Sequence, residues 1–364
     1  MEPYVLLTPG PTPLPPSVYA KLAAPILHHR TAEFSRIFDQ LLSDLKYVYR
    51  TGNTVLMMTA SGTGSMESAV ANLLSAGDKT IVHTVGAFGD RFVKIHRAYG
   101  LAPTVQAEEW GRAADPERLK DALRSNPGTR AVYFQHVETS TGVVNDVKTL
   151  AQVVRDHSDD ALIVVDAISG LAGEELETDA WGLDVVLTGS QKGLMNGPGL
   201  SFAALSERAW AAAEAAKLPR FYLDWRAARA SLQSHETPFT PAVNLVAAQA
   251  EALGLIKEEG IENVWKRTAA LGAFTRQAVA QTLGLKLFAE RPADILTAAW
   301  LPEGVDGTKL LSAMRAEDRV AVADGQGKLK GKMIRIAHMG RISRSDVETG
   351  IATLGRRLSA GAVR

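Results

Sequence analysis

Short apolar runs alternate with helix-like segments along the first half of the chain, and this alternation restricts its fold more than any other feature. The apolar runs cover residues 55–58, 80–83, 131–134, 162–165 and 185–187, and the helix-like segments between them cover residues 66–74, 88–99, 116–124 and 147–157. Strands that alternate with helices form a mainly parallel sheet whose two faces are covered by helices. The sequence therefore predicts an α/β fold.

The flanking segments indicate that this sheet is one of two folded units. A chain of 364 residues is too long for one hydrophobic core of typical size. Residues 8–16 (TPGPTPLPP) are too rich in proline for a helix or a central strand, so they predict an extended arm. Residues 217–243 show no clear period, and a long helical pattern and a smaller α+β pattern follow them. We expect an arm at 1–16, a large domain at 17–243 and a small C-terminal domain at 244–364.

Composition excludes several classes of function. Lys+Arg and Asp+Glu both number 40, so no overall basic field attracts nucleic acid or anionic lipid. The chain has no cysteine, which excludes disulfides, thiolate metal sites and thiol nucleophiles. No signal-peptide pattern opens the sequence, and no apolar run approaches the ~20 residues of a membrane span. We expect a cytoplasmic protein without a membrane or nucleic-acid partner, and no metal site, because His28 and His29 lack further ligands at helical spacing.

Lys192 follows the apolar run at 185–187, in the segment LTGSQKG. A lysine directly after a buried strand is unusual, although it can extend its ammonium to solvent. The glycine-rich residues 193–199 (GLMNGPG) let the backbone approach a ligand closely. A lysine that forms an imine needs such a partly desolvated pocket, so Lys192 is a candidate nucleophile.

Asp166 ends the apolar run at 163–165. Ligands of open α/β sheets bind outside the carboxyl ends of the strands, where a carboxylate can hold a protonated ring nitrogen. Taken alone, Asp166 also fits the pattern of a helix cap or a turn residue that binds no ligand. A lysine at the end of a nearby strand favours the ligand-binding role.

Small residues at 61–66 (SGTGSM) lie between a predicted strand and the helix expected from Met66. The start of a helix offers free N–H groups and a positive dipole to a phosphate. A plain strand–helix turn is the alternative. The segment is not a dinucleotide-binding motif, because Glu67 stands where that motif requires glycine.

Taken together, the motifs resemble those of the class V aminotransferases of fold type I, in the alanine–glyoxylate and serine–pyruvate group. The motifs that carry the resemblance are LLTPGPTPLPP, ASGTGSMESAVANL, GAFGDRF, HVETSTGV, VVDAISG, TGSQKGLMNGPG, FYLD, TPFTPAVNL and GKMIRIAHMG. They occur in the family's order from residue 5 to about residue 340, so the resemblance covers almost the whole chain. It implies a large domain that binds pyridoxal 5'-phosphate and a smaller α+β domain.

The resemblance also assigns roles to single residues. Lys192 matches the catalytic lysine that holds the cofactor as an imine, and Asp166 matches the partner of the pyridine nitrogen. The matched phosphate ligands are Thr63, Gly64, Ser65 and Gln191. Thr139 matches a hydroxyl near the phenolic oxygen, and Phe88 stands where most relatives stack a tryptophan or another aromatic ring on the cofactor.

The remaining matches concern the substrate and a second subunit. Arg335 matches the arginine that binds the substrate carboxylate, and Gly10 is expected beside the substrate. Arginine suits this role because its planar fork binds a carboxylate through two hydrogen bonds. Thr240, and with it Thr237, matches a loop that reaches the phosphate of a neighbouring subunit. The resemblance therefore implies a homodimer.

The expected reaction is a ping-pong transfer of an amino group from alanine or serine to glyoxylate or pyruvate. Cysteine desulfurases share the fold type, but the absence of cysteine excludes that activity. A binding module that has lost catalysis is expected to lack Lys192, Asp166 or Arg335, and all three are present. The alternative is aspartate as donor, which needs a second cation for the second carboxylate. Arg30 or a neighbouring histidine is the candidate for that cation.

Overall fold

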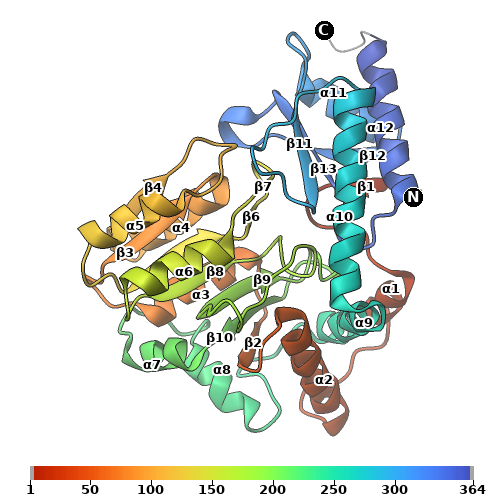
Figure 1. The fold of residues 1–364 in the computed structure, drawn as a ribbon. Coiled ribbons are helices and arrows are strands. Elements are labelled where there is room, and N and C mark those ends of the chain that lie inside the picture. The colour runs from red at the N-terminus through yellow and green to blue at the C-terminus, as the bar shows by residue number, and fades with distance from the viewer. Residues whose placement is uncertain (1–3, 361–364) are drawn as a thin grey trace.

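The computed structural model describes residues 4–360 and contains a large sheet, a smaller sheet and helices that cover both (Figure 1). The large sheet has seven strands in the order β2-β10-β9-β8-β5-β3-β4. Its strands are β2 (Thr54–Met58), β3 (Thr80–Thr84), β4 (Thr104–Ala107), β5 (Ala131–Gln135), β8 (Leu162–Asp166), β9 (Val185–Gly189) and β10 (Ser201–Leu205). β10 runs antiparallel to both neighbours, and every other pair in this sheet is parallel. The predicted α/β fold with a mainly parallel sheet is confirmed.

Helices cover both faces of the large sheet because successive strand residues point to opposite faces. On β8, Val164 packs in one hydrophobic cluster, while Ile163 and Val165 pack in the other. The helices of the Val164 face are α3 (Gly62–Leu73), α4 (Ala87–Ala98), α7 (Glu207–Ala215) and α8 (Trp225–Leu232). The helices of the other face are α2 (Ala32–Tyr49), α5 (Pro116–Ser125), α6 (Val147–His157) and α9 (Val243–Glu259).

The smaller sheet has the order β1-β12-β13-β11. Its strands are β1 (Val5–Leu7), β11 (Leu296–Trp300), β12 (Val320–Asp324) and β13 (Met333–Ala337), and the helices around it are α10 (Ile261–Gln277), α11 (Gly307–Glu317) and α12 (Arg344–Ser359). A π-helical turn, Ala278–Thr282, continues α10. β1 pairs with β12 in parallel, so the N-terminal segment supplies a strand to the C-terminal unit.

Three further short elements, α1, β6 and β7, complete the fold. α1 (Pro16–Leu22) and α2 both pack on α9, and the two-residue strands β6 (Val137–Glu138) and β7 (Val143–Val144) form a small ladder beyond β5. Because α9 packs on α2 and β1 joins β12, contacts cross both expected boundaries, and the division at 16/17 and 243/244 stays a prediction. None of the helices within residues 4–360 combines the length and the apolar character needed to cross a membrane.

Candidate active site

The carboxyl ends of β8 and β9 bring Asp166 and Lys192 to one edge of the large sheet. Asp166 is the last residue of β8 and pairs with Leu187 of the parallel strand β9. Lys192 follows β9 in the turn after Gly189. The two charges lie close enough for each to shift the pKa of the other. The structure therefore places the two residues in one site, as their positions after neighbouring strands require.

Lys192 is held in a narrow space beside the N-terminal segment. Its Nζ donates a hydrogen bond to the Pro9 carbonyl. A Cβ atom at Gly10 would lie 2.5 Å from the Lys192 Cδ and 2.7 Å from Nζ, and Gly10 has a positive φ of +106°. Burial, together with the charge of Arg335, lowers the pKa of Lys192 to about 8. Lys192 is therefore a much less basic amine than an exposed lysine.

Asp166 is a buried carboxyl, with 4% of its surface exposed. Burial raises its pKa to about 7, although the Ile168 amide donates to its Oδ1 at 2.9 Å and opposes that rise. Within residues 4–360 no cationic group lies within ion-pair distance of Asp166. A buried carboxyl without a cationic partner suits a protonated ring nitrogen, whose charge would favour the ionised form.

The first turn of α3 contains the small residues predicted to bind phosphate. The helix begins at Gly62, whereas the sequence predicted a start at Met66, because Ser61 caps it by accepting from the Gly64 amide at 3.4 Å. Thr63 therefore belongs to the first helical turn, where the leading amides lack an intrahelical partner. The hydroxyl of Ser65 donates to the Phe202 carbonyl at 3.1 Å, so this hydroxyl already has a partner.

Gln191, which precedes Lys192, has a buried side-chain oxygen with no hydrogen-bond partner among the described residues. A buried polar atom without a partner is costly, which indicates a ligand that completes its hydrogen bonding. The oxygen and nitrogen of an amide group exchange places by a simple flip, so the buried end of Gln191 is able to present a donor. Such a donor suits a phosphate oxygen.

Arg335 reaches this edge from β13 of the smaller sheet. Its Nη1 donates to the Thr139 carbonyl at 2.7 Å, and its Nε and Nη2 donate to the Asp324 carbonyl at 2.8 and 2.6 Å. Burial lowers the pKa of Arg335 to about 10. Because its partners are neutral carbonyls, its charge stays available to a substrate carboxylate. Thr139 itself is buried in the loop after β6.

Phe88 lies in the first turn of α4, and Glu138 fixes that turn. The Oε2 atom of Glu138 accepts from the amides of Phe88 and Gly89 at 3.0 and 3.1 Å. Its Oε1 accepts from the amide and the hydroxyl of Ser140 at 3.1 and 2.6 Å. Burial raises the pKa of Glu138, and these hydrogen bonds oppose the rise. Glu138 has no distinguishing signal in the sequence, because only its contacts with α4, some 50 residues earlier, mark it.

Thr237 and Thr240 form no hydrogen bond with Lys192, Asp166 or the first turn of α3 within residues 4–360. Thr237 is buried and its hydroxyl donates to the Phe239 carbonyl at 2.7 Å, while Thr240 is exposed. Both line a small cavity beside β2, together with Tyr222. The nearby ring of Phe221 is 80% exposed. A single chain therefore leaves these residues apart from Lys192.

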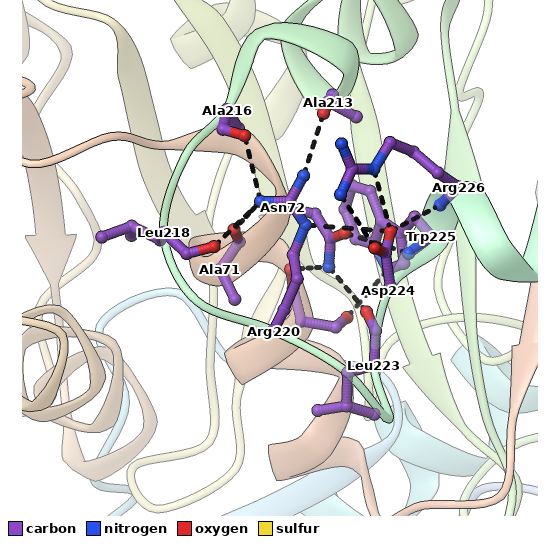
Figure 2. A network of polar contacts seen from close by, with 11 residues as sticks. Ala71, Asn72, Ala213, Ala216, Leu218, Arg220, Leu223, Asp224, Trp225 and Arg226 are labelled. Carbon is purple, nitrogen blue, oxygen red and sulfur yellow. Dashed lines mark hydrogen bonds and ion pairs between the residues drawn. The ribbon is translucent and has the colours of Figure 1, made fainter.

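A polar network fixes the segment that carries the exposed rings (Figure 2). Arg220 donates to four main-chain carbonyls, those of Ala71, Ala213, Ala216 and Leu218. Asn72 of α3 donates to the Leu223 carbonyl at 2.7 Å and accepts from the Trp225 amide at 2.9 Å. The main chain around the exposed Phe221 is therefore held in place by hydrogen bonds.

A second open space, a cleft of about 750 Å³, lies near α6 and α10. Its walls include His136, Glu174 and Trp265, and none of the residues predicted from the sequence lines it. Burial raises the pKa of Glu174 to about 8, and the nearby charge of Asp294 raises it further. This cleft is therefore separate from the edge at which Lys192 and Asp166 meet.

The family match covers residues 6–345 and is described as aminotransferase class V. The chain belongs to this family. A serine–glyoxylate aminotransferase of Methylorubrum extorquens is 36% identical over 358 residues, which cover 95% of this chain and 89% of the relative. An L-aspartate–glyoxylate aminotransferase of Paracoccus denitrificans is 33% identical over 354 residues, 96% of this chain and 89% of the relative. The solved alanine–glyoxylate aminotransferase of Nostoc sp. superimposes with a TM-score of 0.93 at 30% identity, and the match covers 98% of this chain and 96% of that one.

Two of the similar proteins are named as subunits of a soluble hydrogenase. The soluble hydrogenase 42 kDa subunit of Anabaena cylindrica is 40% identical over 354 residues, which cover 96% of this chain and 92% of the relative. Protein iron–sulfur clusters are held mainly by cysteine thiolates, and this chain has no cysteine. The family match and the lysine–aspartate pair agree instead on one activity. This class V enzyme is a pyridoxal-phosphate-dependent transaminase.

Proposed function

We propose that the enzyme transfers the amino group of alanine or serine to glyoxylate or pyruvate, with pyridoxal phosphate bound at Lys192. One observation carries the proposal: the parallel strands β8 and β9 bring Asp166 and Lys192 to one edge of the large sheet, where the charge of Arg335 from the smaller sheet also acts on Lys192. A nucleophilic amine, a partner for the ring nitrogen and a carboxylate clamp therefore meet at one place. The names of the Methylorubrum and Nostoc relatives support the donor and acceptor classes.

When bound, the cofactor supplies an aldehyde carbon for the amino group and an electron-withdrawing ring that stabilises negative charge at the substrate Cα. Lys192 would hold that carbon, and the amine of Lys192, once free, would move the proton of the substrate Cα. With a pKa of about 8, this amine has a substantial neutral fraction near neutral pH, as a general base requires. The same group returns the proton as a general acid.

Asp166 keeps the ring nitrogen protonated, because a buried carboxylate and a ring cation stabilise each other. Arg335 clamps the α-carboxylate and so directs the Cα–H bond toward Lys192, a positioning effect that contributes several kcal/mol. Gly10 leaves the substrate side of Lys192 open. A contact or a charge of the described residues supports each of these proposed roles.

The remaining cofactor contacts are proposed from the donors present. The phosphate is assigned to Thr63, Gly64, the main chain of Ser65, and Gln191. Phe88 is assigned to the face of the ring, on the turn that Glu138 fixes. Thr139 is assigned to the phenolic oxygen. The unpartnered oxygen of Gln191 supports its part in this set.

We also propose that two chains form a homodimer in which Thr240, with Thr237, reaches the phosphate of the partner. The exposed ring of Phe221 supports this, because a large aromatic side chain on firmly bonded backbone marks an interaction surface. The absence of a hydrogen bond between Thr240 and Lys192 within residues 4–360 agrees with it. A cytoplasmic location stays our prediction.

Aspartate is the second candidate donor, and the name of the Paracoccus relative favours it. It needs a second cation for the second carboxylate, and Arg30 is the candidate. Arg30, however, forms an ion pair with Glu236 in this chain. Because that pair already neutralises the charge of Arg30, the small donors remain the first choice.

A panel of amino donors tests the proposal. Purified enzyme is assayed with alanine, serine and aspartate against glyoxylate, pyruvate and 2-oxoglutarate. We expect the highest kcat/KM for a small donor with glyoxylate or pyruvate. Preference for 2-oxoglutarate, or no turnover with any small donor, would contradict the proposed substrates.

A further inference from the structure

The proposed function assigns no role to Arg91, a cationic residue whose side chain reaches the start of α3. It lies on α4, one turn after Phe88, and its Cζ lies 4.6 Å from the centre of the Phe88 ring. Its Nη1 donates to the Thr63 hydroxyl at 2.9 Å. The guanidinium therefore links the ring assigned to the cofactor face with the helix turn assigned to the phosphate.

No carboxylate neutralises Arg91 within the part of the chain that the structure describes, where its polar contact is Thr63 and its ring contact is Phe88. The adjacent Asp90 instead accepts from the Thr84 hydroxyl at 2.8 Å. Burial raises the pKa of Asp166 and lowers that of Lys192, and the charge of Arg91 opposes the first shift and adds to the second. An unpaired guanidinium therefore lies close to the catalytic pair.

The other two cationic residues at the site, Lys192 and Arg335, are assigned to groups other than the phosphate. Lys192 is assigned to the bond with the cofactor, and Arg335, which is held by the carbonyls of Thr139 and Asp324, is assigned to the substrate carboxylate. The assigned phosphate ligands are neutral. A phosphate monoester carries about −1.5 to −2 charges near neutral pH, whereas a helix N-terminus offers the equivalent of about +0.5. The phosphate therefore needs a further positive charge.

We propose that Arg91 supplies this charge, so that its guanidinium and the Thr63 hydroxyl together bind the phosphate of the cofactor. The inference rests on the proposed function, because it requires pyridoxal phosphate at the start of α3. Arginine suits the position, since its planar fork matches two phosphate oxygens while its face lies over an aromatic ring. Lysine would keep the charge and lose the fork.

Binding measurements on the cofactor-free enzyme distinguish the contribution of the phosphate to affinity from that of the ring. Dissociation constants for pyridoxal phosphate and for pyridoxal, which lacks the phosphate, are measured for the wild type, Arg91→Met and Arg91→Lys, with inorganic phosphate as a competitor. Arg97→Met is the matched control, because Arg97 lies exposed on the same helix. We expect Arg91→Met to weaken the binding of pyridoxal phosphate at least tenfold and to change the dissociation constant of pyridoxal less than twofold. It should also abolish competition by inorganic phosphate.

Arg91→Lys should lose less affinity than Arg91→Met, and Arg97→Met should match the wild type. If Arg91→Met does not fold, Arg91→Lys still decides the test. Its affinity for pyridoxal phosphate must fall while its affinity for pyridoxal stays unchanged. Equal losses for both ligands would overturn the inference and leave Arg91 as a support for Phe88. An unchanged affinity ratio with a raised KM for aspartate alone would also overturn it, because Arg91 would then bind a substrate carboxylate. Failure of the wild type to bind pyridoxal phosphate would instead refute the proposed function.

Discussion

The backbone of Gly10 lies against the side chain of Lys192, and a Cβ atom at position 10 would lie 2.7 Å from Nζ. The contact joins the N-terminal segment to the turn after β9. Any side chain at position 10 therefore has to displace the catalytic amine. Gly10 also has a φ of +106°, a conformation that other residues rarely adopt.

Gly10→Ala should therefore lower kcat by about 100-fold, since a displacement of about 1 Å at a reacting group costs that much. Borohydride reduction with peptide mapping should show less cofactor on Lys192 than in the wild type. Gly77→Ala is the control, because Gly77 has a φ of +84° and nothing within 4 Å of its Cβ position. Normal labelling and turnover in Gly10→Ala would show that Lys192 tolerates the added methyl group.

Asp166→Asn should slow both half-reactions by orders of magnitude, because the amide cannot hold the ring nitrogen protonated. The cofactor-free variant should nevertheless be more stable than the wild type at neutral pH. Asp166 has a pKa of about 7 in the folded chain and about 3.9 in the unfolded one. Between these values the folded state binds more protons, so the free energy of unfolding falls as pH rises through this window.

The Asp166→Asn substitution removes this pH dependence of the free energy of unfolding, because asparagine does not titrate. Above pH 7 the cofactor-free variant should gain on the order of 1–3 kcal/mol in free energy of unfolding, and below pH 4 the gain should vanish. Urea unfolding at several pH values measures the effect. Near-normal turnover in Asp166→Asn, or equal stability at every pH, would contradict the assigned environment of Asp166.

Glu138→Ala should destabilise the cofactor-free enzyme and loosen the start of α4. The substitution leaves the amides of Phe88, Gly89 and Ser140 without their acceptor, at a cost of about 1–3 kcal/mol for each group that stays buried. Urea unfolding should show a loss on the order of 2–4 kcal/mol. Glu109→Ala, at an exposed position, is the control and should change stability by less than about 0.5 kcal/mol.

Strongly periodic segments could be predicted from the sequence, while elements that depend on distant partners could not. The long helical pattern expected after the irregular segment 217–243 agrees with α9, because its apolar residues recur at helical spacing. β10 was missed because its residues, SFAAL, are small and follow a glycine-rich turn. α8 was missed inside the segment that showed no period. The pairing of β1 with β12 joins segments more than 300 residues apart, for which one sequence holds no signal.

The candidate site follows the same division. Lys192 and Asp166 were predictable because each follows an apolar strand, and parallel strands bring their carboxyl ends together. Glu138 and Arg91 were not, because their roles depend on contacts with Phe88 and Thr63 that arise only in the fold. Local sequence thus points to the residues proposed to face the ligand, and tertiary contacts point to those proposed to support them.

Phe221→Glu should weaken the proposed dimer, because it puts a charge where an exposed ring is expected to meet the partner. Sedimentation should show a larger fraction of monomer, and the affinity for pyridoxal phosphate should fall with it, since Thr240 of the partner is then lost. Val105→Glu, on the outer strand β4, is the control. A fully active monomer in either the wild type or the variant would overturn the dimer.

The choice between small donors and aspartate depends on Arg30. Its ion pair with Glu236 opposes a role in binding a second carboxylate, so Arg30→Ala should leave kcat/KM for alanine and serine within about twofold. Glu236→Gln is the informative partner variant, because it frees the charge of Arg30 and should raise kcat/KM for aspartate alone. Steady-state kinetics with the three donors measure both effects. A wild-type preference for aspartate of tenfold or more, about 1.4 kcal/mol in transition-state binding, that disappears in Arg30→Ala would show that aspartate is the donor.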